Sequence, residues 1–404
     1  MKIFLLSSTY PYKYSPKGTT PVVHYFAKEW VRTGNQVHVI HTVVAFPRLY
    51  YYLGRLFKNI LDSKLGHLVP NQKPEEYDEE KDGVSISHIT LRKMKPHGRY
   101  PKRQIKSTFE RINRIIDKEG VPDCFVGHWD NPQLELLSLL KQHYGRPTCL
   151  VFHSNQFSYL REIYGSDVSM LLKNIDLVGF RNLSAQMDFE SIYGKQRNAF
   201  VAASGVSSPF IEAGKSSVKT FNKISKFIYV GLLMQRKYPV AVVEALSCSY
   251  KETPFEITFI GDGDEKQNIQ ETYNKLDCKG KMLFTGRIPR EEVIQYLQSS
   301  DVFAMISKGE IFGLVYLEAM ALGCITIAAR NEGLDGIIED GINGFLCESG
   351  NAQELSSIIN RVRSMTTEEL GLMSRKAKET AEYYSDINVA ERYLQQLKNL
   401  SSNN

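Results

Sequence analysis

The stretch DVFAMISKGEIFGLVYLEAMALGCITIAA, residues 301–329, decides the fold. It begins with a short apolar run, continues through a polar loop, and then has the pattern of a helix from about Gly313 to Gly323. A second apolar run follows at once. Parallel strands are joined by crossover helices of this kind. The stretch therefore predicts a βαβ unit, with Gly309 and Glu310 in the loop at the carboxyl end of the first strand.

The same alternation of apolar runs and amphipathic stretches extends over most of the chain. Strand-like runs include KIFLLSS, QVHVIHTVV, CFVGH, TCLVFHS, KFIYVG and EITFIGDG, and helical patterns lie between several of them. Continuous apolar runs suit strands that are buried on both faces. The pattern starts twice, at the amino end and near Lys226. We therefore expect an α/β protein of two Rossmann-like, doubly wound domains that face a central cleft, at residues 1–205 and 226–380. The remaining segments are a Ser-, Gly- and Lys-rich linker at 206–225 and a helix at 381–404 that could return to the first domain.

The composition is that of an ordinary globular protein. The 404 residues are 42% hydrophobic and 24% charged, which excludes a disordered or fibrous chain. No run approaches the ~18 apolar residues that span a bilayer, and the apolar start MKIFLL is short for a signal peptide. We therefore expect a protein of the cytoplasm or of the inner face of the cytoplasmic membrane. The 6 cysteines form no CxxC pair, so a disulfide framework and a zinc site are not expected.

The net charge of +5 is unevenly distributed. Residues 1–120 hold 21 Lys and Arg against 11 Asp and Glu, and the rest of the chain holds 29 (50 − 21) against 34 (45 − 11). A basic front half could meet the phosphates of a nucleic acid, a lipid or a substrate. The acidic run PEEYDEEKD at 74–82 is expected to be a surface loop.

The loop after residue 307 has the chemistry of an anion site. The first N–H groups of the following helix, those of Gly313, Leu314 and Val315, have no partner within the helix and favour a diphosphate. Glu318 lies one turn inside the helix among apolar neighbours. A carboxylate in such surroundings needs a partner, and a pair of ribose hydroxyls would serve.

The string EIFGLVYLEAMALG resembles a motif of the family 4 glycosyltransferases with the GT-B fold, the glycosyl transferases group 1. Glu310 and Glu318 occupy the two glutamate positions of that motif, separated by seven residues. FIYVGLLMQRKYP, FTGRIPREEVIQYLQSSDVF and EDGINGFLC resemble further motifs of the family. SSTYPYKYSPKGTT resembles its first strand and glycine loop. The resemblance covers most of the chain and implies a GT-B fold.

The resemblance also implies roles for single residues. Glu310 would contact the hydroxyls of the donor sugar next to the reacting carbon, and Glu318 would hold the nucleotide ribose. Residues that would surround the sugar and the diphosphate are Phe312, Gly313, Leu314, Gly231 and Lys237. Arg287, after Gly286, would lie near the nucleotide base.

In the first domain, Gly18 and Thr19 match the loop that closes over the donor phosphates. His153 matches an active-site histidine beneath the transferred sugar, and His128 is expected on the acceptor side. Two departures from the family pattern lie beside Lys237. The arginine after the glycine at 231 is replaced by Leu232, and the glycine after the lysine is replaced by Tyr238. Arg236 is the nearest residue that could supply the missing guanidinium.

The resemblance implies a retaining glycosyltransferase that moves a hexose from a nucleotide-sugar donor, with Glu310 and His153 as catalytic residues. We expect no cofactor and no metal, because helix N–H groups and Lys237 can carry the charge of the leaving diphosphate. No aspartate near His153 suits a double displacement, which favours front-face transfer. Alternatives are an enzyme with a small soluble acceptor, a non-catalytic nucleotide-sugar-binding relative, and a sugar-nucleotide 2-epimerase.

Two segments of the first domain could meet an anionic membrane. Residues 45–69 place aromatic and aliphatic residues at helical spacing among basic ones, and residues 91–114 hold many Lys and Arg against a single acidic residue, Glu110. The alternative is that the first segment packs on the sheet and the second is solvated. No nucleic-acid recognition motif accompanies this charge. We expect a glycan or polyprenyl-diphosphate-linked acceptor, as in the assembly of bacterial O-antigen, capsule or exopolysaccharide.

Overall fold

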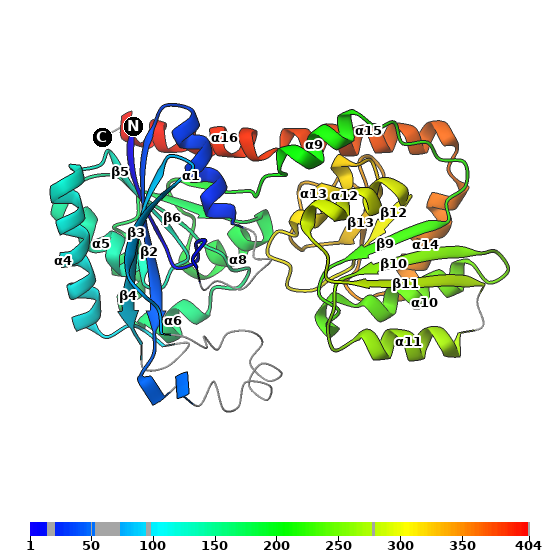
Figure 1. Ribbon diagram of the computed structural model, residues 1–404, viewed down its shortest axis with the longest axis horizontal. Helices are drawn as coiled ribbons and strands as arrows, with labels where there is room; N and C mark the ends of the chain where they lie inside the picture. The colour runs from blue at the N-terminus through cyan, green and yellow to red at the C-terminus, as the bar shows by residue number, and fades with distance from the viewer. Residues whose placement is uncertain (14–20, 50, 53–72, 94–97, 277–278, 403–404) are drawn as a thin grey trace. The chain divides into compact units, whose positions relative to one another are not determined.

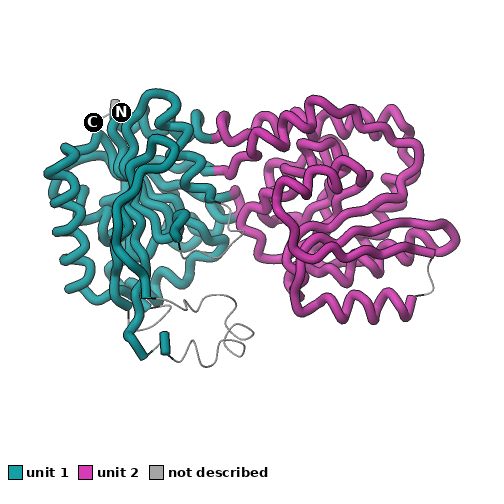
Figure 2. The backbone as a smooth tube through the Cα atoms, in the orientation of Figure 1, with its two compact units in different colours: residues 1–181, 185–202, 390–404 teal, residues 182–184, 203–389 magenta. Residues whose placement is uncertain are grey.

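The computed structural model describes residues 1–13, 21–49, 51–52, 73–93, 98–276 and 279–402. The chain forms two compact units, which Figure 2 shows in different colours. Unit 1 comprises residues 1–181, 185–202 and 390–404, and unit 2 comprises residues 182–184 and 203–389. Each unit is built around its own sheet.

The sheet of unit 1 has, among the described residues, eight strands in the order β3-β4-β2-β1-β5-β6-β7-β8. All neighbours pair in parallel except β3 and β4, which are antiparallel. The strands are β1 (Lys2–Ser7), β2 (Gln36–Ala45), β3 (Tyr77–Lys81), β4 (Val84–Arg92), β5 (Cys124–His128), β6 (Thr148–Val151), β7 (Leu177–Phe180) and β8 (Ala199–Val201). β5, β6 and β7 are buried along their whole length, which explains their uninterrupted apolar sequences.

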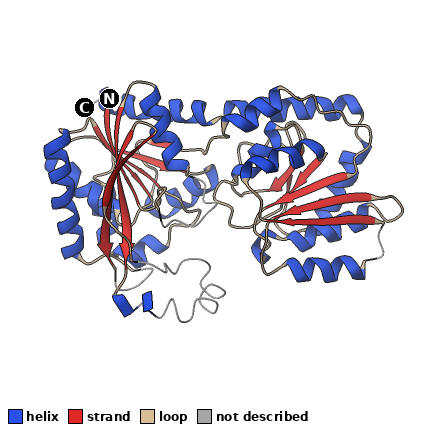
Figure 3. Cartoon of the chain, viewed as in Figure 1, coloured by secondary structure: helices blue, strands red, loops and turns tan. Residues whose placement is uncertain are grey.

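Helices flank this sheet on both faces (Figure 3). They are α1 (Val22–Arg32), α4 (Lys102–Glu119), α5 (Gln133–Tyr144), α6 (Tyr159–Tyr164), α7 (Asp167–Leu172), α8 (Leu183–Tyr193) and most of α16 (Asp386–Ser402). α4 buries Ile105, Ile112 and Ile116 at helical spacing, and these side chains belong to the core beneath it.

The acidic segment 74–82 is not the surface loop that we expected from the sequence. Its residues Tyr77–Lys81 form β3, an edge strand paired with β4. Asp82 and Gly83 have φ values of 52° and 74°, as a tight two-residue hairpin turn requires. The Asp-Gly pair was the signal for this hairpin. Acidic side chains along an exposed edge strand also oppose pairing with another chain.

The sheet of unit 2 has, among the described residues, six parallel strands in the order β11-β10-β9-β12-β13-β14. They are β9 (Lys226–Val230), β10 (Phe255–Ile260), β11 (Gly280–Gly286), β12 (Val302–Ala304), β13 (Ile325–Ala329) and β14 (Phe345–Cys347). The chain leaves β9 toward one edge, returns, and continues from β12 toward the other edge (Figure 1). This strand order is that of the Rossmann fold.

The helical elements of unit 2 are α9 (Ser208–Lys215), η1 (Gln235–Lys237), α10 (Pro239–Ser249), α11 (Lys266–Lys275), α12 (Arg290–Ser299), α13 (Leu314–Ala321), α14 (Ala352–Ser364) and α15 (Thr367–Tyr383). The stretch 206–225, expected as a linker, differs from that expectation. It contains α9, which packs so closely on the end of α13 that a Cβ at Gly214 would lie 1.9 Å from the carbonyl oxygen of Ala321. Gly214, one of the residues that suggested a linker, allows α9 to pack against α13.

The last helix, α16, belongs to unit 1 from Ala390 onward. The indole Nε1–H of Trp30 in α1 donates a hydrogen bond to the carbonyl oxygen of Ala390, at 2.9 Å. The buried ring of Tyr393 packs edge-on against Trp30 and Phe26. The end of the chain is therefore part of the core around its beginning.

Candidate functional site

The strand order of unit 2 places a candidate site between β9 and β12. In open α/β sheets, ligands bind beyond the carboxyl ends of the strands at the point where the chain reverses its direction across the sheet. In unit 2 the reversal falls between these two strands, which are hydrogen-bonded neighbours. The residues that follow them are therefore the first candidates for ligand contacts.

An ion pair joins the segments that follow these two strands. Lys237, in η1 after β9, places Nζ 3.2 Å from Oε2 of Glu310, which follows β12. Their side chains are only 13% and 15% exposed. The hydroxyl of Ser307 donates to the same carboxylate oxygen at 3.4 Å. Two residues that the sequence predicted separately thus meet at the reversal point of the sheet.

Arg236 lies beside this pair and holds the main chain of the Glu310 loop. Its Nη1 donates to the carbonyl oxygens of Lys308, at 3.1 Å, and Gly309, at 3.4 Å. In return, the N–H of Lys308 donates to the carbonyl oxygen of Arg236 at 2.7 Å. Leu232, which stands where the family pattern has arginine, is 43% exposed. The guanidinium of Arg236 thus comes from the segment after β9, in which the family pattern has its arginine, and it holds the loop after β12.

The start of α13 has the geometry of an anion site. Gly313 precedes the helix in a left-handed conformation, with φ 75°, and a Cβ there would lie 2.5 Å from the ring of Tyr316. Only glycine suits this position. Phe312 is buried next to it. The first N–H groups of α13, beginning with that of Leu314, are the groups that a helix leaves without intrahelical partners.

Glu318 is 5% exposed on α13 and has a protein partner that the sequence did not predict. Arg290, at the start of α12, donates to its Oε1 from Nε at 2.6 Å and also from Nη2. Burial raises the pKa of the Glu318 carboxyl, and Arg290 opposes that shift. Arg287, predicted near the nucleotide base, is exposed after β11 and lies two strands from the reversal point. The sequence RIPREE, residues 287–292, contains both arginines and does not indicate which of them contacts Glu318.

In unit 1, two histidines meet at the carboxyl ends of β5 and β6. Nδ1 of His128 lies 2.9 Å from Nε2 of His153, and the ring of Trp129 stacks on His153 at 3.9 Å between centroids. Burial and the charge of Arg181 lower the pKa of His128 to about 3 and that of His153 well below its ordinary value. Both imidazoles are therefore neutral at pH 7.

His128 has no exposed surface, and its Nε2 lies 3.4 Å from the hydroxyl of Tyr393. A direct contact between His128 and an acceptor, as we expected from the sequence, does not fit this burial. The structure makes His128 a support for the partly exposed His153. Gly18 and Thr19 lie outside the described residues. Within the described part of the chain, no cluster of three His, Cys, Asp or Glu side chains is arranged to hold a metal ion.

Residues 212–380, which contain the Lys237–Glu310 pair and Glu318, match the family model described as Glycosyl transferases group 1. Over these residues the chain is similar to this family. Proteins similar to this chain include N-acetyl-alpha-D-glucosaminyl L-malate synthase of Bacillus anthracis, 32% identical over 34% of the chain and 36% of that protein. Another is the lipopolysaccharide core biosynthesis glycosyltransferase LpsE of Rhizobium meliloti, 26% identical over 42% of the chain and 48% of that protein. The chain thus spans less than half the length of these relatives.

Solved structures match almost the whole chain. A glycosyltransferase from Rickettsia africae ESF-5 matches with a TM-score of 0.72 and 18% identity, covering 100% of this chain and 99% of that one. HepE of Anabaena in complex with UDP matches with a TM-score of 0.66 and 18% identity, covering 99% and 100%. At these identities the likeness concerns the fold. The expected GT-B architecture of two Rossmann-like sheets is confirmed.

Proposed function

We propose that this chain is a retaining glycosyltransferase of the group 1 family that transfers a hexose from a nucleotide-diphosphate sugar. The observation that carries the proposal is the Lys237–Glu310 pair beside the amino end of α13. A carboxylate suits sugar hydroxyls, whereas an ammonium and helix N–H groups suit a diphosphate. Glu318 binds the ribose. The segments that follow β9 and β12 therefore offer a partner to the sugar, to the diphosphate and to the ribose of the donor.

The reaction proceeds by front-face transfer. The bond between the anomeric carbon and the phosphate oxygen breaks, and the acceptor hydroxyl forms the new bond on the same face while its proton goes to the leaving phosphate. Lys237 and the first N–H groups of α13 stabilise the negative charge that develops on the diphosphate. Glu310 orients the sugar. No step needs a metal ion.

The test is donor hydrolysis together with product stereochemistry. UDP or GDP is expected to raise the melting temperature of the wild-type protein. The wild-type protein is also expected to release free sugar slowly from UDP-glucose or GDP-mannose. Glu310→Gln should lower the turnover at least 100-fold while the far-UV circular dichroism stays unchanged. The exposed Glu339→Gln is the matched control. An inverted anomeric centre in NMR of the product would contradict retention, and nucleotide binding without any turnover would favour a non-catalytic relative.

We propose a glycan or polyprenyl-diphosphate-linked acceptor in surface polysaccharide assembly. Support comes from LpsE and from the amylovoran biosynthesis glycosyltransferase AmsK of Erwinia amylovora, 31% identical over 27% of this chain and 28% of that protein. The N-acetyl-alpha-D-glucosaminyl L-malate synthase of Bacillus anthracis and a D-inositol 3-phosphate glycosyltransferase of Corynebacterium urealyticum favour the second candidate, a small soluble acceptor. Radiolabelled transfer into the butanol phase of a membrane extract, compared with transfer to soluble acceptors, separates the two.

Docking to an anionic membrane surface is part of the same proposal. α4 buries its isoleucines on the sheet of unit 1 and exposes basic side chains, including Lys102, Arg103 and Lys106. Of segment 45–69, only 45–49, 51 and 52 are described, and Leu49 and Tyr52 among them are strongly exposed. No helix in the described part of the chain is long and apolar enough to cross a bilayer. Sedimentation with anionic vesicles at low salt, with and without neutralised Lys102 and Arg103, tests this docking.

A further inference from the structure

Glu332, in the connection between β13 and β14, contacts the main chain of the candidate site. Its Oε2 accepts a hydrogen bond from the backbone N–H of Glu310 at 2.8 Å. The contact brings a second carboxylate to the residue whose side chain pairs with Lys237. A charged acceptor on a backbone N–H makes a stronger hydrogen bond than a neutral one. Glu332 therefore fixes the backbone of Glu310.

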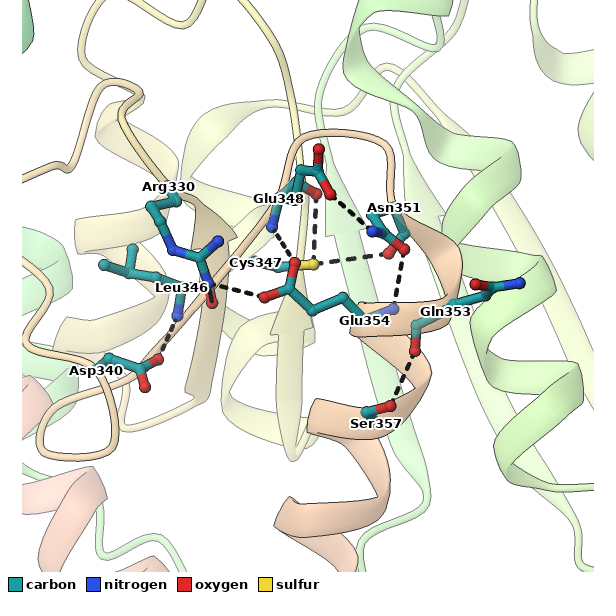
Figure 4. Close-up of polar contacts among 9 residues, drawn as sticks. All are labelled: Arg330, Asp340, Leu346, Cys347, Glu348, Asn351, Gln353, Glu354 and Ser357. Carbon is teal, nitrogen blue, oxygen red and sulfur yellow. Dashed lines mark hydrogen bonds and ion pairs between the residues drawn. The ribbon is translucent and has the colours of Figure 1, made fainter.

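The start of this connection is anchored to β14 and α14. The backbone N–H of Arg330 donates to the carbonyl oxygen of Cys347 at 2.8 Å, and its Nη2 donates to that of Leu346 at 3.1 Å. The same Nη2 lies 2.7 Å from Oε1 of Glu354, as Figure 4 shows. The other oxygen of Glu354 accepts from the N–H of Glu348 at 2.7 Å. The residue two positions before Glu332 is thus held by three separate contacts.

The residues on either side of Glu332 also fix its direction. Asn331 has a φ of 59°, in the left-handed region. A Cβ at Gly333 would lie 2.5 Å from the carbonyl oxygen of Phe312, so the two loops touch through their main chains. Only glycine permits such an approach. Glu332 is therefore carried toward Glu310 by a rigid turn.

The carboxylate of Glu332 has no counter-ion among the described residues. No described lysine, arginine or histidine forms an ion pair with it, whereas Lys237 pairs with Glu310 and Arg330 with Glu354. Glu332 also contributes to the raised pKa of the buried Tyr316, after burial itself, Glu310 and Tyr229. An anionic substituent on a sugar at Glu310 would meet this charge.

We propose that Glu332 determines donor specificity by charge, so that the site takes nucleotide sugars whose hexose is neutral or carries an amino group and rejects hexuronates. The inference rests on the proposed function, because it assumes that Glu310 contacts the donor sugar. Two like charges about 7 Å apart, at an effective dielectric constant of about 20, correspond to roughly a 10- to 100-fold preference. Glu332 acts without touching the reacting atoms and is a specificity-determining residue.

The experiment compares matched pairs of donors that differ only at C6. Donor hydrolysis is measured with UDP-glucose against UDP-glucuronate and with GDP-mannose against GDP-mannuronate. Wild-type protein should favour the neutral member of the accepted pair roughly 10- to 100-fold in kcat/KM. Glu332→Gln keeps an oxygen for the Glu310 N–H and removes the charge, so it should lower this ratio at least fivefold.

Two controls separate charge from structure. Glu332→Asp keeps the charge and should keep the preference, and Glu339→Gln removes an exposed charge from the same connection and should leave the ratio unaltered. Equal use of hexose and hexuronate by the wild-type protein, or an unchanged ratio in Glu332→Gln, would overturn the proposal. Failure of all four donors, and of UDP and GDP alone, to raise the melting temperature would instead contradict the proposed function on which it rests.

Discussion

Arg290 donates two hydrogen bonds to one oxygen of Glu318, from Nε and Nη2. The guanidinium comes from the start of α12 and the carboxylate from the middle of α13, so the pair ties two crossover helices of unit 2 together. The ring of Phe210 in α9 lies beneath the guanidinium at 5.6 Å. A carboxylate that we expected to depend on a ribose for its partner therefore has one within the protein.

Removal of Arg290 should destabilise the protein more than removal of the exposed Arg287. Arg290→Met leaves the buried carboxylate of Glu318 without its partner. We expect a loss of about 2–3 kcal/mol in the free energy of unfolding, less than for a fully buried pair because the Arg290 side chain is 27% exposed. The double variant Arg290→Met with Glu318→Gln should recover at least half of that loss. Urea denaturation measures the free energy of unfolding of the two single variants and of the double variant. Equal losses in Arg290→Met and Arg287→Met would show that the Arg290–Glu318 pair does not stabilise the fold.

Leu232→Arg should tighten nucleotide binding. The residue follows β9 at the reversal point of the sheet, its side chain is exposed, and a guanidinium there offers a forked donor to a diphosphate. We expect a threefold to tenfold lower Kd for UDP or GDP by isothermal titration calorimetry. Leu232→Gln, of similar length and without charge, is the control. Unchanged affinity in Leu232→Arg would mean that the diphosphate lies away from this residue.

Two helical glycines should respond to alanine in opposite directions. Gly214→Ala in α9 places a Cβ 1.9 Å from the carbonyl oxygen of Ala321, so the helices must separate, and we expect a loss of at least about 2 kcal/mol. Gly371→Ala in α15 meets nothing nearer than a flexible arginine nitrogen at 3.7 Å. Its higher helix propensity should add about 0.5–1 kcal/mol. Thermal unfolding of the two variants tests the close packing of α9, which a flexible linker would not show.

Unit 1 should lose stability as the pH falls below about 6.5. Burial lowers the pKa of His41 and of His128 to about 3, with further lowering from His88 and from Arg181 respectively. Between pH 6.5 and 3 the unfolded chain therefore binds protons that the folded chain excludes. Stability is fully present above pH 6.5, and each histidine removes about 1.4 kcal/mol per pH unit as the pH falls. This loss ends near pH 3.

The measurement is the free energy of unfolding between pH 7.5 and 5. His41→Asn should reduce its slope against pH by about one proton. A slope that is identical in His41→Asn and in the wild type would contradict the assignment.

The elements around the candidate site were predictable from the sequence because their signals are local. Residues 301–329 predicted strand, loop, helix and strand, and the structure has β12, α13 and β13 there. The reversal of strand order that brings Lys237 to Glu310 is not a local property. The alternation of strands and helices predicted a doubly wound sheet, but it did not predict that Lys237 pairs with Glu310.

Contacts between distant segments could not be predicted from the pattern. Arg290 reaches Glu318 over 28 residues, and Glu332 reaches the N–H of Glu310 over 22. Neither pair has a spacing that distinguishes it from solvated charges. The errors at 74–82 and 206–225 are of another kind. In both segments a glycine was taken as a sign of a loop. Gly83 instead forms a hairpin turn, and Gly214 allows two helices to pack closely.

The return of α16 to unit 1 has a consequence for biosynthesis. Trp30 and Ala390 are separated by 360 residues, so the pocket around Trp30, Phe26 and His128 receives Tyr393 only after the segment 203–389 has been made. During translation the segment 203–389 can complete its own core first. Until Tyr393 is made, the side chains of Phe26 and Trp30 lack the ring that covers them in the folded protein. A chaperone that binds apolar surfaces would find its target in residues 1–202 of the nascent chain, and that target would disappear once the residues around Tyr393 have emerged.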